Sequence, residues 1–120
     1  MLKNILLVAV GSAVGGALRY TVSLLMRWSG NGFPWGTFAV NLAGCLLIGC
    51  LAGAFSRYTS QLLNLLLTVG FCGGFTTFST FSRESLALLQ SGQWWTLAAY
   101  LLLSIILGIA MTATGYVLSK

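Results

Sequence analysis

The groups with the greatest capacity for chemistry lie in one stretch of this sequence, from Gly70 to Ser82. The stretch holds three glycines and five hydroxyl residues within thirteen positions. Glycine costs about 1 kcal/mol relative to alanine inside a helix, and serine and threonine compete for backbone hydrogen bonds. The composition predicts a helix that is broken near Gly73 to Thr77. Such a break frees carbonyls and amides that are able to bind ions, and a kink without a ligand is the alternative.

Two phenylalanines, Phe78 and Phe81, follow the predicted break. Aromatic rings have electron-poor edges, so ring edges placed beside hydroxyls and an amide are able to coordinate a small anion without a fixed positive charge. Asn41 is the candidate amide, and it has four hydrogen-bonding positions to satisfy. Plain packing for the phenylalanines and a structural cross-link for Asn41 are the alternative interpretations.

Other polar residues recur every four positions, which places them on one face of a helix. The two clearest stripes are Thr37, Asn41, Cys45 and Tyr100, Ser104, Gly108, Thr112. Serine and threonine often bond to their own helix or to a neighbour, so hydrogen bonding between helices is the simplest role for any one of them. A line of donors along an ion pathway is the other.

The charged residues are few and strongly biased, with six lysines and arginines, one glutamate and no histidine. A single carboxylate without histidine makes neither a metal cluster nor an acid and base pair, so no enzyme activity is predicted. Arg19 lies within a hydrophobic segment and needs a partner or water; it is expected to support the fold or to bias an anion pathway. Glu84 beside Arg83 is interpreted as local charge compensation.

These residues need elements that position them, and the composition predicts membrane helices. The chain has 120 residues, of which 58% are hydrophobic and 6% charged, whereas soluble domains carry about 25% charged residues. A membrane-spanning helix needs about 20 apolar residues. Four segments qualify, and together they form one predicted transmembrane domain over residues 1–120. Their approximate ranges are 4–26, 35–55, 62–89 and 94–118.

The links between the four segments are short, so neighbouring helices are expected to be antiparallel. Aromatic residues cluster near the predicted helix ends, as at membrane interfaces. They are Trp28, Phe33, Trp35, Tyr58, Trp94, Trp95 and Tyr116. Lys3, Arg57 and Lys120 fall on one side and Arg27 on the other, which is a small bias for fixing orientation. Insertion in both orientations, and with it an antiparallel homodimer, is therefore permitted.

The motifs resemble those of the Fluc/CrcB family of fluoride channels. The stretch from Gly70 to Ser82 matches the hallmark of that family's third helix, and Gly36-Thr37 with Asn41-Leu42 matches its second-helix motif. Weaker matches are Gly15 with Leu18-Arg19-Tyr20 in the first helix and Ala110-Met111-Thr112 in the fourth. Together these matches run through the four predicted helices in order. One departure is Gly108, where the family often has serine.

The resemblance implies an antiparallel, dual-topology homodimer in the bacterial plasma (inner) membrane, which passively exports fluoride from the cytoplasm. It also implies a central sodium ion held by main-chain carbonyls, for which Gly73 and Thr76 are the matching positions. The implied fluoride-pathway residues are Asn41, Phe78, Phe81, Thr37, Ser104, Tyr100, Thr80 and Arg19.

Two other functions are compatible with a short four-helix membrane protein. A proton-coupled small multidrug exporter typically has a carboxylate deep in its first helix, where this chain has Arg19 and no acid. A membrane assembly factor or holin-like protein would not need Asn41 or a broken third helix. The residue pattern therefore favours the channel.

Overall fold

The computed structural model describes residues 1–28, 32–57 and 60–120, and every regular element within them is a helix. Four helical spans are long and apolar enough to cross a membrane: Leu2–Leu25, Trp35–Phe55, Gln61–Gln90 and Trp94–Ser119. Helices suit lipid because each satisfies its own backbone hydrogen bonds. The predicted all-helical fold with four membrane-spanning helices is confirmed. Tyr58, one of the predicted interfacial aromatics, lies outside the described residues.

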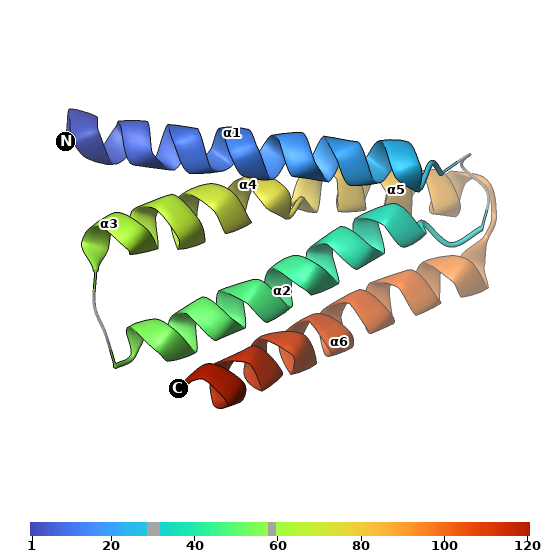
Figure 1. Cartoon of the computed structure of the whole chain (residues 1–120). Helices are drawn as coiled ribbons and strands as arrows, with labels where there is room; N and C mark the ends of the chain where they lie inside the picture. The colour runs from blue at the N-terminus through green and yellow to red at the C-terminus, as the bar shows by residue number, and fades with distance from the viewer. Residues whose placement is uncertain (29–31, 58–59) are drawn as a thin grey trace.

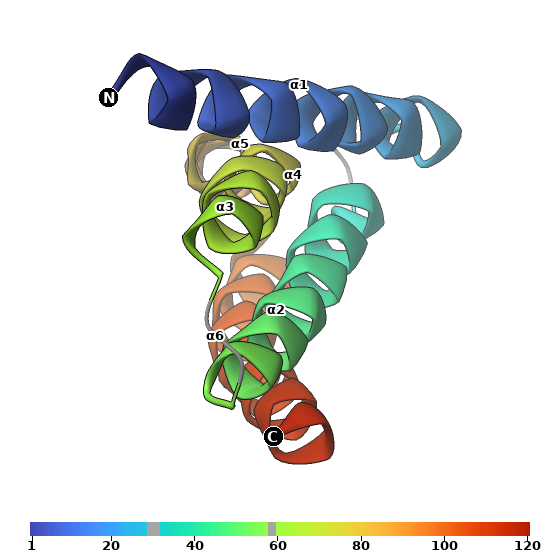
Figure 2. The ribbon, with the colours of Figure 1, turned by 60° about the vertical axis from the view of Figure 1, so that its left-hand side comes forward.

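The spans are arranged as two pairs of helices (Figures 1 and 2). Helix α1 (Leu2–Leu25) lies along the third span, and α2 (Trp35–Phe55) lies beside α6 (Trp94–Ser119). The third span consists of α3 (Gln61–Leu63), the π-helix η1 (Asn64–Cys72), α4 (Gly73–Phe75) and α5 (Phe78–Gln90). Both termini lie at the same end of the molecule (Figure 1).

Glycines bring the helices of each pair into backbone contact. A Cβ atom at Gly15 of α1 would meet the carbonyl of Phe71, and one at Gly49 of α2 would meet the carbonyl of Thr112. Both glycines are buried. Small residues at such positions let membrane helices approach closely and gain van der Waals contact. The two helix pairs therefore depend on these glycines.

Alanine at Gly15 is expected to destabilise the protein, because its Cβ would lie 2.8 Å from the amide nitrogen of Phe75 and closer still to the carbonyl of Phe71. Overpacking of this kind costs about 1–3 kcal/mol. Gly16 is the matched control, since a Cβ there would meet only the Arg19 side chain, at 4.0 Å. Thermal unfolding in detergent should give a lower midpoint for Gly15→Ala and an unchanged or higher one for Gly16→Ala. Equal midpoints would contradict the packing of α1 on the third span.

Regular α-helix gives way to extended backbone at two residues of the third span. Thr76 has φ −81° and ψ 157°, and Thr77 has φ −147° and ψ 122°. The break was predicted near Gly73 to Thr77; the extended residues Thr76 and Thr77 lie at the end of that range, and Gly73 to Phe75 are α-helical. Helix persists there because Gly74 packs on the backbone of Ser12, where a Cβ would lie 2.6 Å from the carbonyl oxygen. Tertiary packing thus overrides the low helix propensity of glycine.

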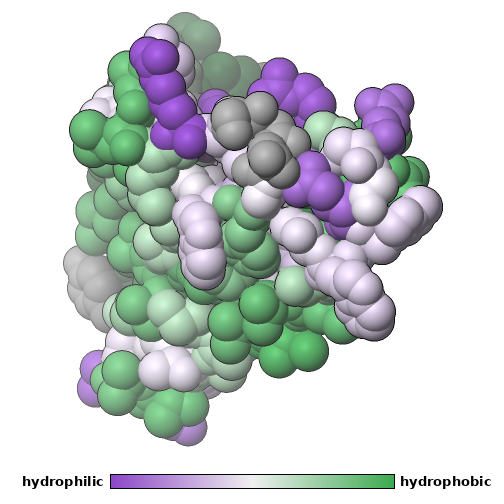
Figure 3. Space-filling model, turned by 90° about the vertical axis from the view of Figure 1, so that its right-hand side faces the viewer, coloured by the Kyte–Doolittle hydropathy of each residue, from purple (hydrophilic) through white to green (hydrophobic). Residues whose placement is uncertain are grey.

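The surface is largely apolar, as expected for contact with lipid. Figure 3 views the end of the molecule that holds the α5–α6 turn, and hydrophobic residues cover most of it, with polar residues gathered in its upper part. On α6, Ile106 and Ile109 are 59% and 68% exposed, and on α1 Val10 is 57% exposed. Exposed aliphatic side chains on both the first and the last helix would be unfavourable in water, so the surface is suited to a membrane.

Candidate functional site

Asn41 holds the extended part of the third span through two hydrogen bonds to Thr77, which together we call the brace. The amide N–H of Thr77 donates to Asn41 Oδ1 at 2.9 Å, and Asn41 Nδ2 donates to the Thr77 carbonyl at 3.1 Å. Helix α2 thus holds both backbone polar groups of one extended residue. Nδ2 carries two hydrogens, so one donor of the amide remains beyond this brace. Asn41 therefore forms a structural cross-link, one of the two roles considered for it from the sequence, and its second N–H takes no part in these two bonds.

The backbone carbonyls of Gly73 and Thr76 are deprived of their usual donors. In a continuous α-helix each would accept from the amide four residues later. The Thr77 amide donates to Asn41 instead, and the Thr80 amide donates to Thr77 Oγ1 at 3.2 Å. Thr77 acts here as the N-cap of α5, which is a favoured role for threonine. The same two bonds that start α5 therefore leave two carbonyls for another partner.

Arg19 binds the carbonyl of Gly74, which lies between Gly73 and Thr76 along the chain. Arg19 Nε on α1 donates to the Gly74 carbonyl at 3.1 Å. A cation at the C-terminal end of a helix is favoured by the helix dipole and satisfies an orphan carbonyl. Arg19 therefore supports the end of α4, which is the structural role considered for it from the sequence.

A groove of about 610 Å³ opens on the side of the extended residues that carries the aromatic rings. We call it the phenylalanine groove. Its lining includes Asn41, Cys45, Gly73, Thr76, Thr77, Phe78, Phe81 and Ser104. Phe78 is 78% exposed, and its ring centroid lies 5.9 Å from that of Phe81. Phe81 in turn lies 4.9 Å from the ring of Tyr100.

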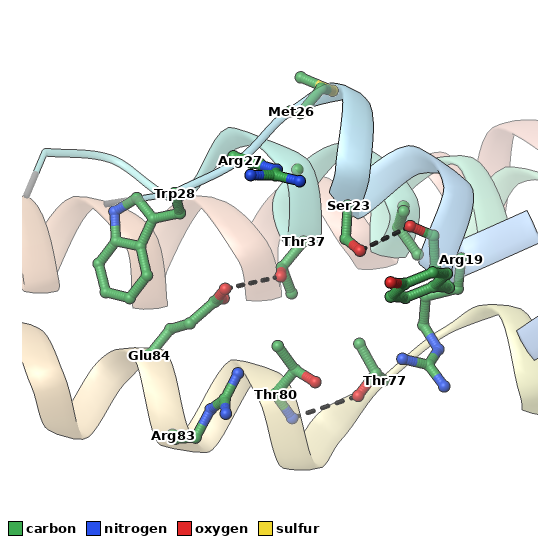
Figure 4. Close-up of a pocket in the computed structure, with 13 residues that line it drawn as sticks. Arg19, Ser23, Met26, Arg27, Trp28, Thr37, Thr77, Thr80, Arg83 and Glu84 are labelled. Carbon is green, nitrogen blue, oxygen red and sulfur yellow. Dashed lines mark hydrogen bonds between the residues drawn. The ribbon is translucent and has the colours of Figure 1, made fainter. Parts of the chain in front are cut away.

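A separate pocket of about 440 Å³, the arginine pocket, also borders Thr77 (Figure 4). Its lining includes Arg19, Arg27, Thr37, Thr77, Thr80, Arg83 and Glu84. Three arginines beside one carboxylate give this pocket a positive balance that attracts anions. Thr77 lines both the groove and the pocket, so the extended segment separates them.

Glu84 connects two of the predicted pathway residues. Its carboxylate accepts from Thr37 Oγ1 at 3.0 Å and from Tyr100 Oη at 2.9 Å, and the residue is only 7% exposed (Figure 4 shows the bond from Thr37). The interpretation of Glu84 as a local partner for Arg83 is therefore corrected. The α5 helix turns this side chain inward, where two hydroxyls stabilise it, while Arg83 is exposed.

Two hydroxyls near the groove have no hydrogen-bond partner among the described residues. Thr68 Oγ1 and Ser104 Oγ are both buried, and both residues line the phenylalanine groove. A buried unpaired polar group costs about 1–3 kcal/mol unless something else satisfies it. The unpaired hydroxyls therefore mark this groove as a place where a polar ligand or a further polar surface fits.

Most of the predicted site residues lie in one of two adjoining regions, the phenylalanine groove and the arginine pocket. Asn41, Phe78, Phe81, Ser104, Gly73 and Thr76 line the phenylalanine groove, and Arg19, Thr37 and Thr80 line the arginine pocket. Tyr100 lines neither and is fully buried behind Phe81. Sequence reasoning missed Thr77, which holds the boundary between the two regions. The sequence feature that could have indicated its role is a hydroxyl residue three positions before Thr80, which is the spacing of an N-cap bond.

Four apolar spans, one of them interrupted beside a cluster of hydroxyls and aromatic rings, define a multi-pass membrane protein. The model of the CrcB-like protein family, described as camphor resistance (CrcB), matches residues 6–116. The chain belongs to this family.

Similar proteins carry one common description. A protein of Phocaeicola vulgatus named fluoride-specific ion channel FluC is 45% identical, over 99% of this chain and 100% of its own length. Proteins of the same name from Desulfotalea psychrophila and Azobacteroides pseudotrichonymphae are 47% and 44% identical, over 97% and 100% of this chain and 91% and 98% of their own lengths.

Proposed function

We propose that this protein is a fluoride-selective channel, not an enzyme, that lets fluoride leave the bacterial cytoplasm passively through the plasma membrane. The similarity to proteins named fluoride-specific ion channel supports this function. The structural observation that best supports this function is the pair of hydrogen bonds between Asn41 and Thr77. The Asn41 amide, the carbonyls without helical donors and the Phe78–Phe81 ring pair all lie at the same break in the third span.

Fluoride is small, strongly hydrated and a strong hydrogen-bond acceptor, so a pathway must replace its water with donors. The candidate donors are the second N–H of Asn41, the hydroxyl of Ser104 and the ring edges of Phe78 and Phe81, all of which line the phenylalanine groove. None of these groups carries a charge. Conduction requires sites that an ion also leaves readily, and neutral donors meet that requirement better than a buried cation.

The arginine pocket, which shares Thr77 with the phenylalanine groove, is proposed as the entrance. Arg19, Thr37 and Thr80 line it, and its positive balance raises the local concentration of anions. Tyr100 contributes through Glu84, which it shares with Thr37. An anion moving from this pocket to the groove passes Thr77, whose backbone Asn41 holds in place.

The working unit is proposed to be an antiparallel, dual-topology homodimer. Phe78 and Gly73 are exposed on the single chain, although they line the same groove as the buried, unpaired hydroxyl of Ser104. A second copy placed against this face would cover the groove and turn it into a closed path. The small charge bias across the membrane allows the opposite orientation that such a dimer needs.

The freed carbonyls of Gly73 and Thr76 suit a sodium ion between the two subunits. Carbonyl oxygens are hard ligands, and the usual amide donors of both are engaged elsewhere. Bound sodium would supply positive potential at the dimer centre and satisfy these oxygens. Thermal unfolding of the dimer in sodium chloride and in N-methylglucamine chloride tests this proposal: the midpoint should rise with sodium concentration. Equal midpoints would argue against a sodium site.

Efflux of fluoride from liposomes that contain the purified protein tests the function, with chloride efflux as the selectivity control. Fluoride should leave rapidly without any proton gradient, while chloride is retained. Well-folded protein that releases no fluoride would overturn the channel. Efflux that requires a proton gradient would favour the exporter, although the one acidic residue, Glu84, lies on α5 and is already bound by two hydroxyls.

Isoleucine at Phe81 should lower fluoride efflux about tenfold, because it keeps apolar bulk but removes the ring edge, and the same liposome assay measures the loss. Aromatic pairs gain about 0.5–1.5 kcal/mol from their geometry, and a ring edge that faces an anion is taken to contribute a similar amount, which corresponds to as much as about tenfold. Phe71→Ile is the matched control, since Phe71 stacks on Phe75 with centroids 5.8 Å apart and does not line the groove. Unchanged efflux through Phe81→Ile would make Phe81 a packing residue only.

A further inference from the structure

The polar stripe on α6 has a gap that a residue of α2 fills. Gly108 has no side chain and stands between Ser104 and Thr112, one helical turn from each. A Cβ atom placed on Gly108 would lie 3.5 Å from Cys45 Sγ. The thiol of Cys45 therefore lies against α6 at the level where that helix offers no polar group.

Cys45 also lies where two grooves join. A second groove, of about 690 Å³, continues along α2 and α6 and is lined by Cys45, Ser104, Gly108 and Thr112 together with apolar residues. Cys45, Ser104 and the apolar residue Ile105 line this groove and the phenylalanine groove as well. A ligand that moves between the two grooves passes these three side chains, of which Cys45 and Ser104 are the polar ones.

A second, independent observation at this junction is a buried polar group without a partner. Ser104 Oγ is buried and has no hydrogen-bond partner among the described residues. Cys45 is a free cysteine, and no hydrogen bond of its thiol is found in the part of the chain that the structure describes. Thr112 Oγ1, in contrast, donates to the Gly108 carbonyl at 3.0 Å. The junction therefore presents two unengaged donors, one hydroxyl and one thiol.

We propose that the Cys45 thiol is an anion-contacting residue of the pathway, paired with Ser104 and replacing the hydroxyl that α6 lacks at Gly108. This inference rests on the proposed fluoride channel. A thiol is a weak donor. It contributes to the replacement of water without holding the ion strongly, which suits a site that an ion must leave.

This role is tested by removing the thiol from α2 and then adding a hydroxyl to α6. Cys45→Ala should lower fluoride efflux about fivefold, which corresponds to the loss of one hydrogen bond. The double variant Cys45→Ala/Gly108→Ser should restore efflux, because a hydroxyl then occupies the gap and the smaller alanine leaves room for it. Cys50→Ala is the matched control: Cys50 lies five residues further along α2 and does not line either groove. It should conduct like the native protein.

Efflux through the native protein separates the two proposals. If the native protein releases no fluoride, the channel itself is wrong. If it conducts and Cys45→Ala conducts equally well, Cys45 has no part in the pathway. Failure of the double variant to recover efflux would also overturn the replacement of the missing hydroxyl.

Chemical modification gives a second test that does not depend on the folding of Cys45→Ala. A Cys50→Ala background leaves the thiols of Cys45 and of Cys72, and Cys72 is only 2% exposed. The Cys45 thiolate attacks the sulfenyl sulfur of sulfonatoethyl methanethiosulfonate, forming a mixed disulfide and releasing methanesulfinate. Modification should abolish fluoride efflux, and dithiothreitol should restore it. A thiol that mass spectrometry shows to be unmodified, or a modified protein that conducts normally, would overturn the proposal.

Discussion

Aspartate at Asn41 is expected to reduce fluoride efflux by at least about a hundredfold. Aspartate still accepts from the Thr77 amide, but it has no N–H for the Thr77 carbonyl, which Asn41 Nδ2 binds at 3.1 Å. It also adds a negative charge to the groove. At an effective dielectric constant of 20, two like charges 4 Å apart repel by about 4 kcal/mol, which is roughly a thousandfold in occupancy.

Asn64→Asp is the matched control, because it makes the same chemical change at an exposed residue that does not line the groove. Liposome efflux of fluoride should be lost for Asn41→Asp and retained for Asn64→Asp. Asn41→Ala distinguishes the two causes: it removes the brace without adding charge. Normal efflux through both Asn41 variants would show that neither the brace nor the amide belongs to the pathway.

Hydropathy was sufficient to predict the four spans, because lipid requires long apolar segments with internally bonded backbones. The glycine contacts between helices were also foreseeable, since Gly11, Gly15, Gly49 and Gly53 follow the four-residue spacing of close helix packing, and all four are buried. Both features depend on local patterns that single segments carry.

The position of the extended residues was harder to predict, because local and tertiary preferences compete there. Propensity predicted a break near Gly73 to Thr77 without resolving its position, and the contact of Gly74 with Ser12 keeps Gly73 to Phe75 helical. The N-cap bond of Thr77 and the brace from Asn41 then shift the extended backbone to Thr76 and Thr77. The brace joins residues 36 positions apart, which no local pattern reveals.

The hydrogen-bond partners of Glu84 could not be predicted from its neighbours in the sequence either. Arg83 is its neighbour in sequence, but adjacent residues on a helix point in different directions. The actual partners, Thr37 and Tyr100, come from two other spans. The usable signal was that Glu84 is the sole carboxylic side chain of an apolar chain, and such a group at membrane depth needs hydrogen-bond donors.

Leucine at Glu84 is expected to destabilise the protein by about 2–4 kcal/mol. It removes the acceptor of two hydroxyls, and each polar group left buried without a partner costs about 1–3 kcal/mol. Tyr100 is fully buried, so its hydroxyl has no access to water, while Thr37 is partly buried. Thermal or denaturant unfolding in detergent measures the loss.

The triple variant Glu84→Leu/Thr37→Val/Tyr100→Phe should recover most of that stability. Replacing all the partners of a buried hydrogen-bonded group by apolar side chains of similar shape is nearly neutral, whereas removing one partner is not. If the triple variant is no more stable than Glu84→Leu alone, the loss comes from packing rather than from the orphaned hydroxyls.

Fluoride efflux through the refolded triple variant then decides what these three residues do. Thr37 lines the arginine pocket, and both Thr37 and Tyr100 donate to the carboxylate of Glu84. If their hydroxyls belong to the pathway, the stable triple variant should conduct at least about tenfold less than the native protein, because two donors are gone. Native efflux would instead assign Thr37, Glu84 and Tyr100 to the fold alone, and would confine the pathway to Asn41, Ser104 and the phenylalanine groove.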